Sequence, residues 1–228
     1  MNVVIIGGGA PKKFGNDLAL RMRDDGHNVY IVSHKNYNTG HPHDIMANFN
    51  TTQGVVDAFN EVTKDVAVID IILFNSNAGS YPCDEDCFTS TSIVDLKRWE
   101  ENIRLACHIP HILGVEALKR MNENSKIIFM ISYMAVLFNR KEYTSYAGYA
   151  GNKAMQAHMM RAFAEHNDKG AISTAIAPHF AYDKPEVYKQ TFEIVYNYIN
   201  KLTIKDNSKI MYVDAFAKPP SITNYAGL

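Results

Sequence analysis

Short apolar runs alternate with helical patterns along this chain of 228 residues, and that alternation restricts the fold more than any other feature of the sequence. Strand-like runs lie at 3–6, 29–32, 45–49, 67–74, 126–131, 172–176 and 210–213. Helical patterns lie at 16–25, 51–63, 93–121, 149–166 and around 186–202. Strands that alternate with helices form parallel sheets through right-handed crossovers. The sequence therefore predicts an α/β fold, a doubly wound parallel sheet of about seven strands with helices on both faces.

No linker or repeat divides the chain, and 46% hydrophobic with 21% charged residues is typical of one compact domain. Within this single domain, 1–228, we expect a short substrate lid around 180–208. The turn-rich C-terminal tail at 217–228 is expected to pack on the surface or on a neighbouring subunit. Pro110 lies inside the helical pattern at 93–121. Because proline lacks an N–H, we expect two helices or one bent helix there.

The charge balance excludes one class of partner. Lys plus Arg number 23 and Asp plus Glu 24, for a net charge of −1. Binding of nucleic acid depends on a basic excess, so no nucleic-acid partner is expected. The sequence has no apolar run of about 18 residues and no positively charged leader at its start. We therefore expect a cytoplasmic protein with no membrane contact.

The three cysteines, Cys83, Cys87 and Cys107, cannot all pair. The Cys-x3-Cys spacing of the first two has no second ligand pair nearby, and its neighbours are hard carboxylates. We interpret Cys83 and Cys87 as loop thiols and predict neither a disulfide framework nor a metal site; Cys107 lies within the helical pattern at 93–121.

A glycine-rich turn, residues 7–15, separates the first strand from the first helix. Such a turn lets backbone N–H groups approach a pyrophosphate, and the helix N-terminus adds positive potential. A glycine cluster alone is a weak signal, with a simple tight turn as the alternative, but its place between strand and helix favours a dinucleotide. The predicted cofactor-binding residues of this turn are Gly7, Gly8, Gly9, Lys12, Lys13, Phe14 and Gly15.

The second strand ends in Ser33-His34-Lys35, where dinucleotide-binding folds usually carry an acidic residue for the ribose hydroxyl. No carboxylate is present there. Lys35, helped by Lys12 or Lys13, could instead pair with a 2′-phosphate. The sequence thus favours NADP(H) over NAD(H), with Ser33, His34 and Lys35 as cofactor-binding residues; the alternative is that these lysines are solvated loop charges.

Three further motifs follow in order: Asn77-Ala78-Gly79, Ser132 and Tyr149-x-x-x-Lys153. With the glycine turn, they resemble the short-chain dehydrogenase/reductase family in its single-domain Rossmann form, over residues 2 to about 213. In that resemblance Gly8 or Gly9 with Gly15 matches the glycine fingerprint, with Lys13 in place of the middle glycine. It also implies a set of roles: cofactor contacts by Asn48, Asn77, Ala78, Gly79, Pro178 and Phe180, and a catalytic tetrad of Asn102, Ser132, Tyr149 and Lys153.

The chemistry of this tetrad follows from residue type and spacing. Tyr149 and Lys153 are four apart on a helix and share one face, so the ammonium could lower the pKa of the phenol from about 10. The phenol would then act as general acid to a carbonyl oxygen, and both residues would also bind the cofactor. Ser132, at the end of a strand, would donate a hydrogen bond to the same oxygen. In the family, the helix asparagine, here Asn102, holds a water that relays protons to the lysine.

The sequence departs from the family pattern in three places. Tyr149 lies 17 positions after Ser132, a spacing longer than the family usually shows, so we expect the loop at 133–145 to bulge over the site. Tyr146 lies seven residues before Lys153, a spacing that resembles the enoyl-acyl-carrier-protein reductases. After the sixth strand, His179 stands where the family has glycine; it is a substrate contact or an ordinary loop histidine.

The sequence therefore predicts an NADP(H)-dependent oxidoreductase that interconverts a small-molecule carbonyl and an alcohol, with Tyr149 as general acid and base. One alternative is an enoyl-thioester reductase that uses Tyr146. Another is an NADP-binding sensor without catalysis. The family resemblance also suggests a homodimer or homotetramer. Met155, Met159, Met160 and Phe163 form an apolar stripe on the helix expected at 149–166. This stripe is either the interface of such an oligomer or the face of the helix that packs on the core.

Overall fold

A computed structural model describes residues 1–35, 37, 41–76, 100–136, 147–179, 183–214, 216–217 and 221–225. These residues contain an eight-stranded sheet in the order β3-β2-β1-β4-β5-β6-β7-β8. All pairs are parallel except the last, between β7 and β8. The strands are β1 Asn2–Ile6, β2 Asn28–Ser33, β3 Asp44–Met46, β4 Ile71–Phe74, β5 Lys126–Met130, β6 Ile172–Pro178, β7 Ile210–Asp214 and β8 Ser221–Tyr225. The predicted doubly wound α/β fold is confirmed.

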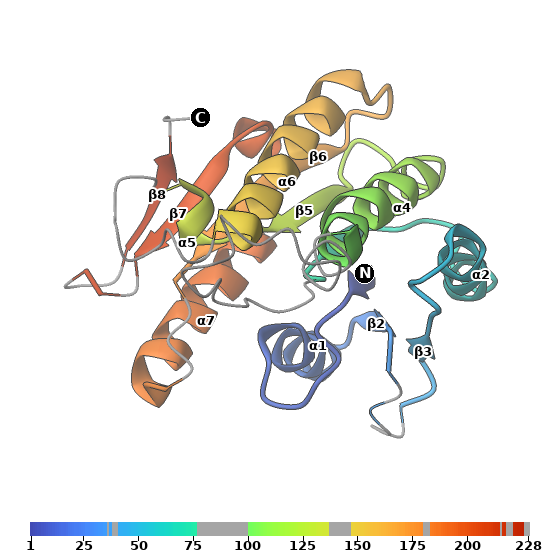
Figure 1. Cartoon of the computed structure of the whole chain (residues 1–228), viewed down its shortest axis with the longest axis horizontal. Helices are drawn as coiled ribbons and strands as arrows, with labels where there is room; N and C mark the ends of the chain where they lie inside the picture. The colour runs from blue at the N-terminus through green and yellow to red at the C-terminus, as the bar shows by residue number, and fades with distance from the viewer. Residues whose placement is uncertain are drawn as a thin grey trace.

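Helices cover both faces of this sheet (Figure 1). Helices α2, α4 and α6 lie on one face, and α1 and α7 lie on the other. A short helix α5 follows β5, and a π-helical turn precedes α4. The bounds are α1 Phe14–Asp24, α2 Thr52–Thr63, π turn Arg104–His108, α4 Ile109–Leu118, α5 Tyr133–Val136, α6 Ala147–His166, α7 Pro185–Lys201 and a 3-10 turn Ile204–Asp206.

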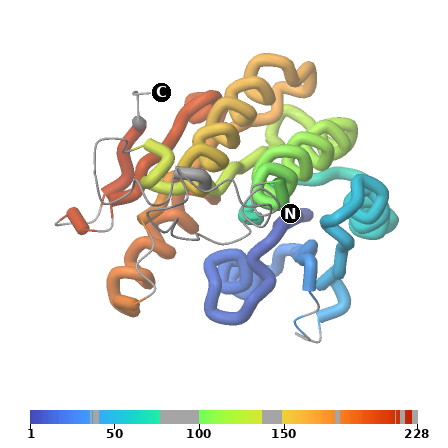
Figure 2. The backbone as a smooth tube through the Cα atoms, in the orientation of Figure 1, coloured from blue at the N-terminus to red at the C-terminus, as the bar shows by residue number. Residues whose placement is uncertain are grey.

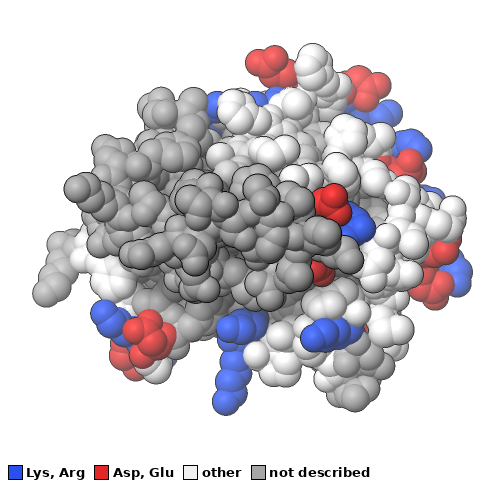
Figure 3. All heavy atoms as spheres, in the orientation of Figure 1, with Lys and Arg blue, Asp and Glu red and all other residues white. Residues whose placement is uncertain are grey.

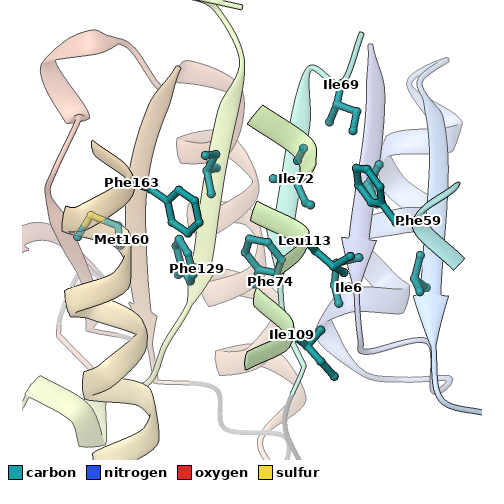
Figure 4. Close-up of a cluster of buried hydrophobic side chains, with 14 of the residues drawn as sticks. Ile6, Phe59, Ile69, Ile72, Phe74, Ile109, Leu113, Phe129, Met160 and Phe163 are labelled. Carbon is teal, nitrogen blue, oxygen red and sulfur yellow. The ribbon is translucent and has the colours of Figure 1, made fainter. Parts of the chain in front are cut away.

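The strands form two cores because they are buried on both faces and carry apolar side chains in alternate directions. One core lies under α2, α4 and α6, and Figure 4 shows Phe74, Phe129 and Phe163 meeting there. The Phe74 and Phe129 ring centroids are 5.0 Å apart. The second core, under α1 and α7, contains Phe14 and Phe192. Two cores back to back hold the sheet rigid between its helices, and so fix its strand ends.

The order of the strands places the ends of β1 and β4 side by side at the point where the connections reverse direction. Ile6 pairs with Phe74, and Phe74 pairs with Phe129 of β5. The residues that follow these three strands therefore emerge at one edge of the sheet. In open parallel sheets this switch point is where ligands bind.

Two predictions for the C-terminal part are corrected by the structure. The predicted tail at 217–228 contains β8, which pairs with β7 through the register Val213 with Ile222. Strand β7 would otherwise be the edge of the sheet, and β8 pairs its open hydrogen-bonding groups. Figure 2 follows this end of the chain to the edge of the molecule, away from the first strand. The alternation of apolar residues in 221–225 is too short to separate a strand from a turn.

The second correction concerns the predicted lid at 180–208. In its described part, 183–208, most residues belong to α7, whose Phe192, Val195 and Ile199 are buried in the core under the sheet. Residues 180–182 lie outside the described residues. Helix α7 therefore covers the sheet, because it shares a core with α1.

Two smaller expectations also changed. Strand β4 starts at Ile71 rather than at 67, and β3 ends at Met46 rather than at 49. Beyond β3 the Asn48 side chain accepts a hydrogen bond from the Asn50 N–H. This bond stabilises a turn, which competes with continued strand pairing after Met46. Cys107 is a buried thiol in the π turn, within the predicted helical segment, whereas Cys83 and Cys87 lie outside the described residues.

Pro110 lies in the first turn of α4, directly after the π turn, and the helical residues continue from before Arg104 to Leu118. The expected separation into two helices is thus not seen: the change at Pro110 is from π to α geometry. Proline has no N–H to donate within this continuous stretch.

The charged side chains of the described residues do not gather by sign on the face that Figure 3 shows. On the face in Figure 3, positive and negative side chains of the described residues stand next to one another. In the same part of the chain, no helix is both long and apolar enough to cross a membrane.

Candidate functional site

A cavity of about 520 Å³ opens at the strand ends described above. It brings together residues that lie far apart in the sequence, from the glycine turn to the end of β6. Its lining consists of Gly7, Gly8, Ala10, Lys13, His34, Tyr37, Asn75, Ser76, Leu105, Met130, Ile131, Ser132, Tyr133, Met134, Tyr149, Lys153 and Pro178. The glycine turn, the end of β2 and three of the predicted catalytic residues thus border one space.

Gly7 and Gly8 form the part of this lining that consists of backbone alone. Both have a positive φ, 84° and 80°, in the left-handed region that favours glycine. A Cβ at Gly7 would lie 2.5 Å from the Ser76 Cα, and one at Gly8 would lie 2.3 Å from the Asn75 Nδ2. No side chain fits at either position. The Gly7 N–H donates to the Val32 carbonyl at 2.8 Å, and both glycines line the cavity through backbone atoms.

Gly15 has a different task from Gly7 and Gly8. It lies in the first turn of α1, where a Cβ would stand 2.9 Å from the Asn75 Nδ2 and 3.0 Å from the Gly7 carbonyl oxygen. Only glycine lets α1 pack this closely on the end of β1. The N-terminus of α1 is thereby held beside the turn, and its first residue, Phe14, is buried in the core.

The start of α1 can attract an anion. Its cap residue, Lys13, makes no side-chain capping bond, so the first N–H groups of the helix are not taken by the cap. Lys13 also lines the cavity. An uncapped helix start beside an open glycine backbone fits the pyrophosphate of a dinucleotide. Lys12, exposed and at φ 60°, and Gly9 belong to the same turn but do not line the cavity among the described residues.

The residues predicted to contact the ribose are only partly brought to the cavity. His34 lines it, whereas Lys35 is exposed and does not line it, and Ser33 is buried. The Ser33 hydroxyl donates to the Lys35 carbonyl at 2.7 Å, which fixes the turn after β2. Asn48 is exposed and does not line the described cavity. The sequence analysis missed Tyr37, which borders the cavity close to Gly9.

Ser132 and Tyr149 are brought together as the motif spacing suggests. Ser132 follows β5 and is buried, and its hydroxyl oxygen accepts a hydrogen bond from the Met134 N–H at 3.2 Å. Its hydroxyl is also hydrogen-bonded to that of Tyr149, which lies on α6. Burial raises the pKa of Tyr149, and the bond from Ser132 opposes that rise. The sequence analysis expected Lys153 to lower this pKa. In the structure burial outweighs the other influences, so the phenol keeps its proton at neutral pH.

Lys153 lies one helical turn after Tyr149 and is almost fully buried. Its ammonium donates to the Met130 carbonyl at 2.8 Å, to the Gln156 Oε1 at 3.0 Å and to the Ser76 carbonyl at 3.4 Å. Burial lowers its pKa to about 7, and the neighbouring Cys107 thiol acts in the opposite direction. A lysine with this pKa can hold or release a proton near neutrality.

Asn102 is placed differently from the other three predicted catalytic residues. It is half-buried in the helical residues directly before the π turn, and it does not line the described cavity. The side chain that bonds to Lys153 from this side is Gln156, which the sequence analysis did not single out. No pattern in the sequence marks Gln156, because a polar residue on a helix is normally exposed.

Several predicted site residues fall outside the described residues: Asn77, Ala78, Gly79, Phe180 and Tyr146. Of the expected long loop at 133–145, the described part is Tyr133 to Val136, which forms α5. The His179 ring stacks on that of Tyr133, with centroids 3.8 Å apart, and meets the Phe216 ring edge-on at 4.6 Å. Where the structure is described, no three His, Cys, Asp or Glu side chains are placed to hold a metal ion.

Comparison with known proteins finds likeness in structure but not in sequence. No family model and no curated protein matches the sequence. A short-chain dehydrogenase/reductase from Serratia marcescens matches the structure with a TM-score of 0.74 and 14% identity, over 94% of this chain and 96% of that chain. A short-chain dehydrogenase/reductase from Brucella melitensis, named glucose/ribitol dehydrogenase, matches with a TM-score of 0.73 and 15% identity over 94% of each chain. BdcA in complex with NADPH matches with a TM-score of 0.72 and 17% identity, over 94% of this chain and 93% of that chain. The resemblance inferred from the motifs is thus confirmed for the fold, which is the Rossmann-type fold of the short-chain dehydrogenases/reductases.

Proposed function

We propose that this chain, with the fold of the short-chain dehydrogenases/reductases, is an NADP(H)-dependent oxidoreductase that interconverts a ketone or aldehyde and an alcohol. The observation that carries the proposal is the shared cavity, in which the open glycine backbone and Ser132, Tyr149 and Lys153 line one space. A sensor that only binds a dinucleotide needs the first group and not the second.

Tyr149 is the proton donor of the proposed reaction. Its phenol is protonated at neutral pH because burial raises its pKa, and a protonated phenol can donate to a carbonyl oxygen as negative charge develops there. The Ser132 hydroxyl, already hydrogen-bonded to that of Tyr149, can donate to the same oxygen. Lys153, one helical turn after Tyr149, holds or releases a proton near neutral pH, because burial lowers its pKa to about 7.

The residues present fit a nicotinamide dinucleotide. Gly7, Gly8 and the N-terminus of α1 would hold the pyrophosphate, and Pro178 and Lys153 border the part of the cavity next to Tyr149. When bound, the nicotinamide supplies or takes the hydride. In the resemblance Asn77, Ala78, Gly79 and Phe180 would add further contacts.

The preference for NADP(H) over NAD(H) rests on charge. Residues 33–37 contain no carboxylate, Lys13 and His34 line the cavity, and Lys35 directly follows His34 in the chain. A 2′-phosphate would gain charge-assisted hydrogen bonds from these lysines. BdcA, one of the structures with the same fold, was solved with NADPH.

The test is the oxidation of NADPH, followed by absorbance, with a panel of ketones, aldehydes and enoyl thioesters. The proposal expects turnover with at least one ketone or aldehyde. Turnover of enoyl thioesters alone would replace it with the reductase that uses Tyr146. Tight NADPH binding without turnover of any substrate would favour the sensor.

We also propose that the protein acts as a homodimer or homotetramer. Of the apolar stripe on α6, Met160 and Phe163 are buried in the core and Met159 packs against it, whereas Met155 is exposed. Val115 of α4 is exposed as well. Light scattering tests this state, and a monomer at all concentrations would contradict it.

A further inference from the structure

Gln156 is a polar side chain that is completely buried, with an exposed fraction of 0%. It lies on α6, three residues after Lys153. Its Oε1 accepts a hydrogen bond from the Lys153 ammonium at 3.0 Å, and its Nε2 donates to the Ala106 carbonyl at 2.8 Å. Burying an amide costs free energy unless its polar atoms are bonded, and here both ends have partners.

The chemistry of these partners fixes the orientation of the amide. An ammonium can only donate and a carbonyl can only accept, so the amide oxygen must face Lys153 and the amide nitrogen must face Ala106. The Gln156 side chain is therefore a directional bridge from the π turn to Lys153.

The π turn presents its carbonyls beside Pro110. The Ile109 N–H donates to the Arg104 carbonyl, in the spacing of a π-helix. Residue 110 is a proline and has no N–H, so the helix has one backbone donor fewer directly after Ile109. Two side chains donate to carbonyls of the turn: the Ser76 hydroxyl donates to the Leu105 carbonyl at 2.9 Å, and Gln156 donates to that of Ala106.

We propose that Gln156 is a positioning residue of this enzyme: anchored on the Ala106 carbonyl of the π turn, its amide oxygen holds the Lys153 ammonium, which lines the cavity. This inference rests on the proposed function, because it assigns Gln156 to the same site. The β5 end and Ser76 fix Lys153 with two carbonyls. Gln156 adds the only side-chain acceptor that the described residues give it.

The charges around Lys153 make its protonation a direct reporter of this bond. The described titratable groups that face it are the Cys107 thiol of the π turn and the Tyr149 phenol on its own helix. Neither carries a negative charge at neutral pH, since burial raises the pKa of each. An acceptor placed or removed at position 156 should therefore move the pKa of Lys153 with little competition.

The experiment compares Gln156→Leu, which removes both the acceptor for Lys153 and the donor to Ala106, with Gln156→Glu. The second variant keeps the shape and the acceptor, adds a negative charge beside Lys153, and replaces the donor to the Ala106 carbonyl by an oxygen. The pKa of Lys153 is read from its Cε signal in protein labelled with 13C-lysine, assigned with Lys153→Met. We expect Gln156→Glu to raise that pKa by about one unit or more, and Gln156→Leu to lower it. With a substrate found by the panel, we expect kcat to fall on the order of tenfold in Gln156→Leu. The pH at which kcat is half-maximal should move with the pKa of Lys153.

Ser173→Ala is the matched control. Ser173 is also completely buried, and its hydroxyl donates at 2.8 Å to the Met160 carbonyl of the same helix, α6, away from Lys153. The Ser173→Ala variant should lose a comparable hydrogen bond but keep the wild-type pKa of Lys153 and the wild-type kcat. If Gln156→Leu does not fold, Gln156→Glu still carries the test, because it preserves volume.

The outcomes separate this inference from the proposed function. An unchanged Lys153 pKa in both Gln156 variants, or an equal change in Ser173→Ala, would overturn the role of Gln156 whatever the activity. Shifted pKa values in a protein that reduces no carbonyl would support the Gln156 contact while contradicting the proposed function. Shifted pKa values with a kcat profile that stays in place would overturn the role of Gln156 in turnover.

Discussion

The cavity joins two groups of lining residues that differ in how they are made. On the glycine side, Gly7 and Gly8 contribute backbone, and any side chain there would collide with Ser76 or Asn75. On the tyrosine side, Ser132, Tyr149 and Lys153 contribute side chains whose properties depend on burial and on their hydrogen bonds. In the proposed function the glycines would bind the cofactor through their backbone, and Ser132, Tyr149 and Lys153 would act through side chains whose pKa values depend on their surroundings. A substitution should therefore cost binding and folding on the glycine side, and turnover on the tyrosine side.

The largest expected effect is on the tyrosine side. Tyr149→Phe removes the proposed proton donor but leaves the ring, so turnover should fall by roughly 10²- to 10⁴-fold while NADPH affinity stays near that of the wild type. Steady-state kinetics and a fluorescence titration of NADPH measure the two quantities. Tyr196→Phe on α7 is the control: it loses its bond to Asp25 on the other face of the sheet and should keep its turnover. Wild-type turnover in Tyr149→Phe would remove the assigned role.

On the glycine side, Gly8→Ala and Gly26→Ala form a matched pair. Both positions have a φ near 80°, but a Cβ at Gly26 meets nothing within 4 Å, whereas one at Gly8 meets Asn75. The strain of the left-handed backbone should cost each variant about 1 kcal/mol. The collision should cost Gly8→Ala roughly 1–3 kcal/mol more, together with most of its NADPH affinity. Urea unfolding measures the stability of both variants, and titration measures their NADPH affinity. Equal losses of stability and affinity in the two variants would show that the close contact between Gly8 and Asn75 is unimportant.

Burial of Lys153 should appear in the pH dependence of stability. Its folded pKa of about 7 lies below the ordinary 10.5, so between these values the unfolded chain binds a proton that the folded chain does not. The free energy of unfolding should then rise with pH, by at most about 1.4 kcal/mol per unit, and this rise should be absent in Lys153→Met. Urea unfolding of both proteins at pH 6, 7, 8 and 9 tests the sign. Parallel curves would mean that the ammonium is not desolvated.

The smallest expected effect concerns the choice of cofactor. Lys35→Ala should weaken NADPH binding by about tenfold, the worth of one charge-assisted hydrogen bond, and leave NADH binding unchanged. Lys119→Ala is the control, because Lys119 is paired with Glu116 on α4. Competitive titration of the two cofactors measures the ratio. Tighter binding of NADH by the wild-type protein would contradict the preference inferred from residues 33–35.

Local patterns carried much of the prediction. The apolar runs located seven of the strands, since strands buried on both faces are continuous apolar segments. Thr51 caps α2 with its hydroxyl, as its residue type predicts. The spacing of Ser132, Tyr149 and Lys153 identified three side chains that the fold brings to one cavity. Strand β8 and the core position of α7 were missed, because both depend on what the chain packs against.

The environment of each site residue could not be read in the same way. Tyr149 and Lys153 were expected to interact through charge, with a lowered pKa for the phenol, but burial dominates both pKa values. Desolvation depends on every element that closes over a group, including β5, the π turn and α6, and these are far apart in the sequence. The role of Gln156 could not be read from the sequence either. One of its partners, Lys153, lies one turn away on the same helix, but the other, the Ala106 carbonyl, comes from the distant π turn.

The sequence by itself determined the alternation of strands and helices, the glycine turn after β1 and the order of the motifs, because each depends on residue type and short-range spacing. The tertiary structure decided what those residues experience. It placed an uncapped helix start beside open backbone, buried Lys153 on two carbonyls, and set Gln156 between that lysine and the π turn before Pro110. Free energies of burial and hydrogen bonding are properties of the packed chain, so they appear only when its distant segments meet.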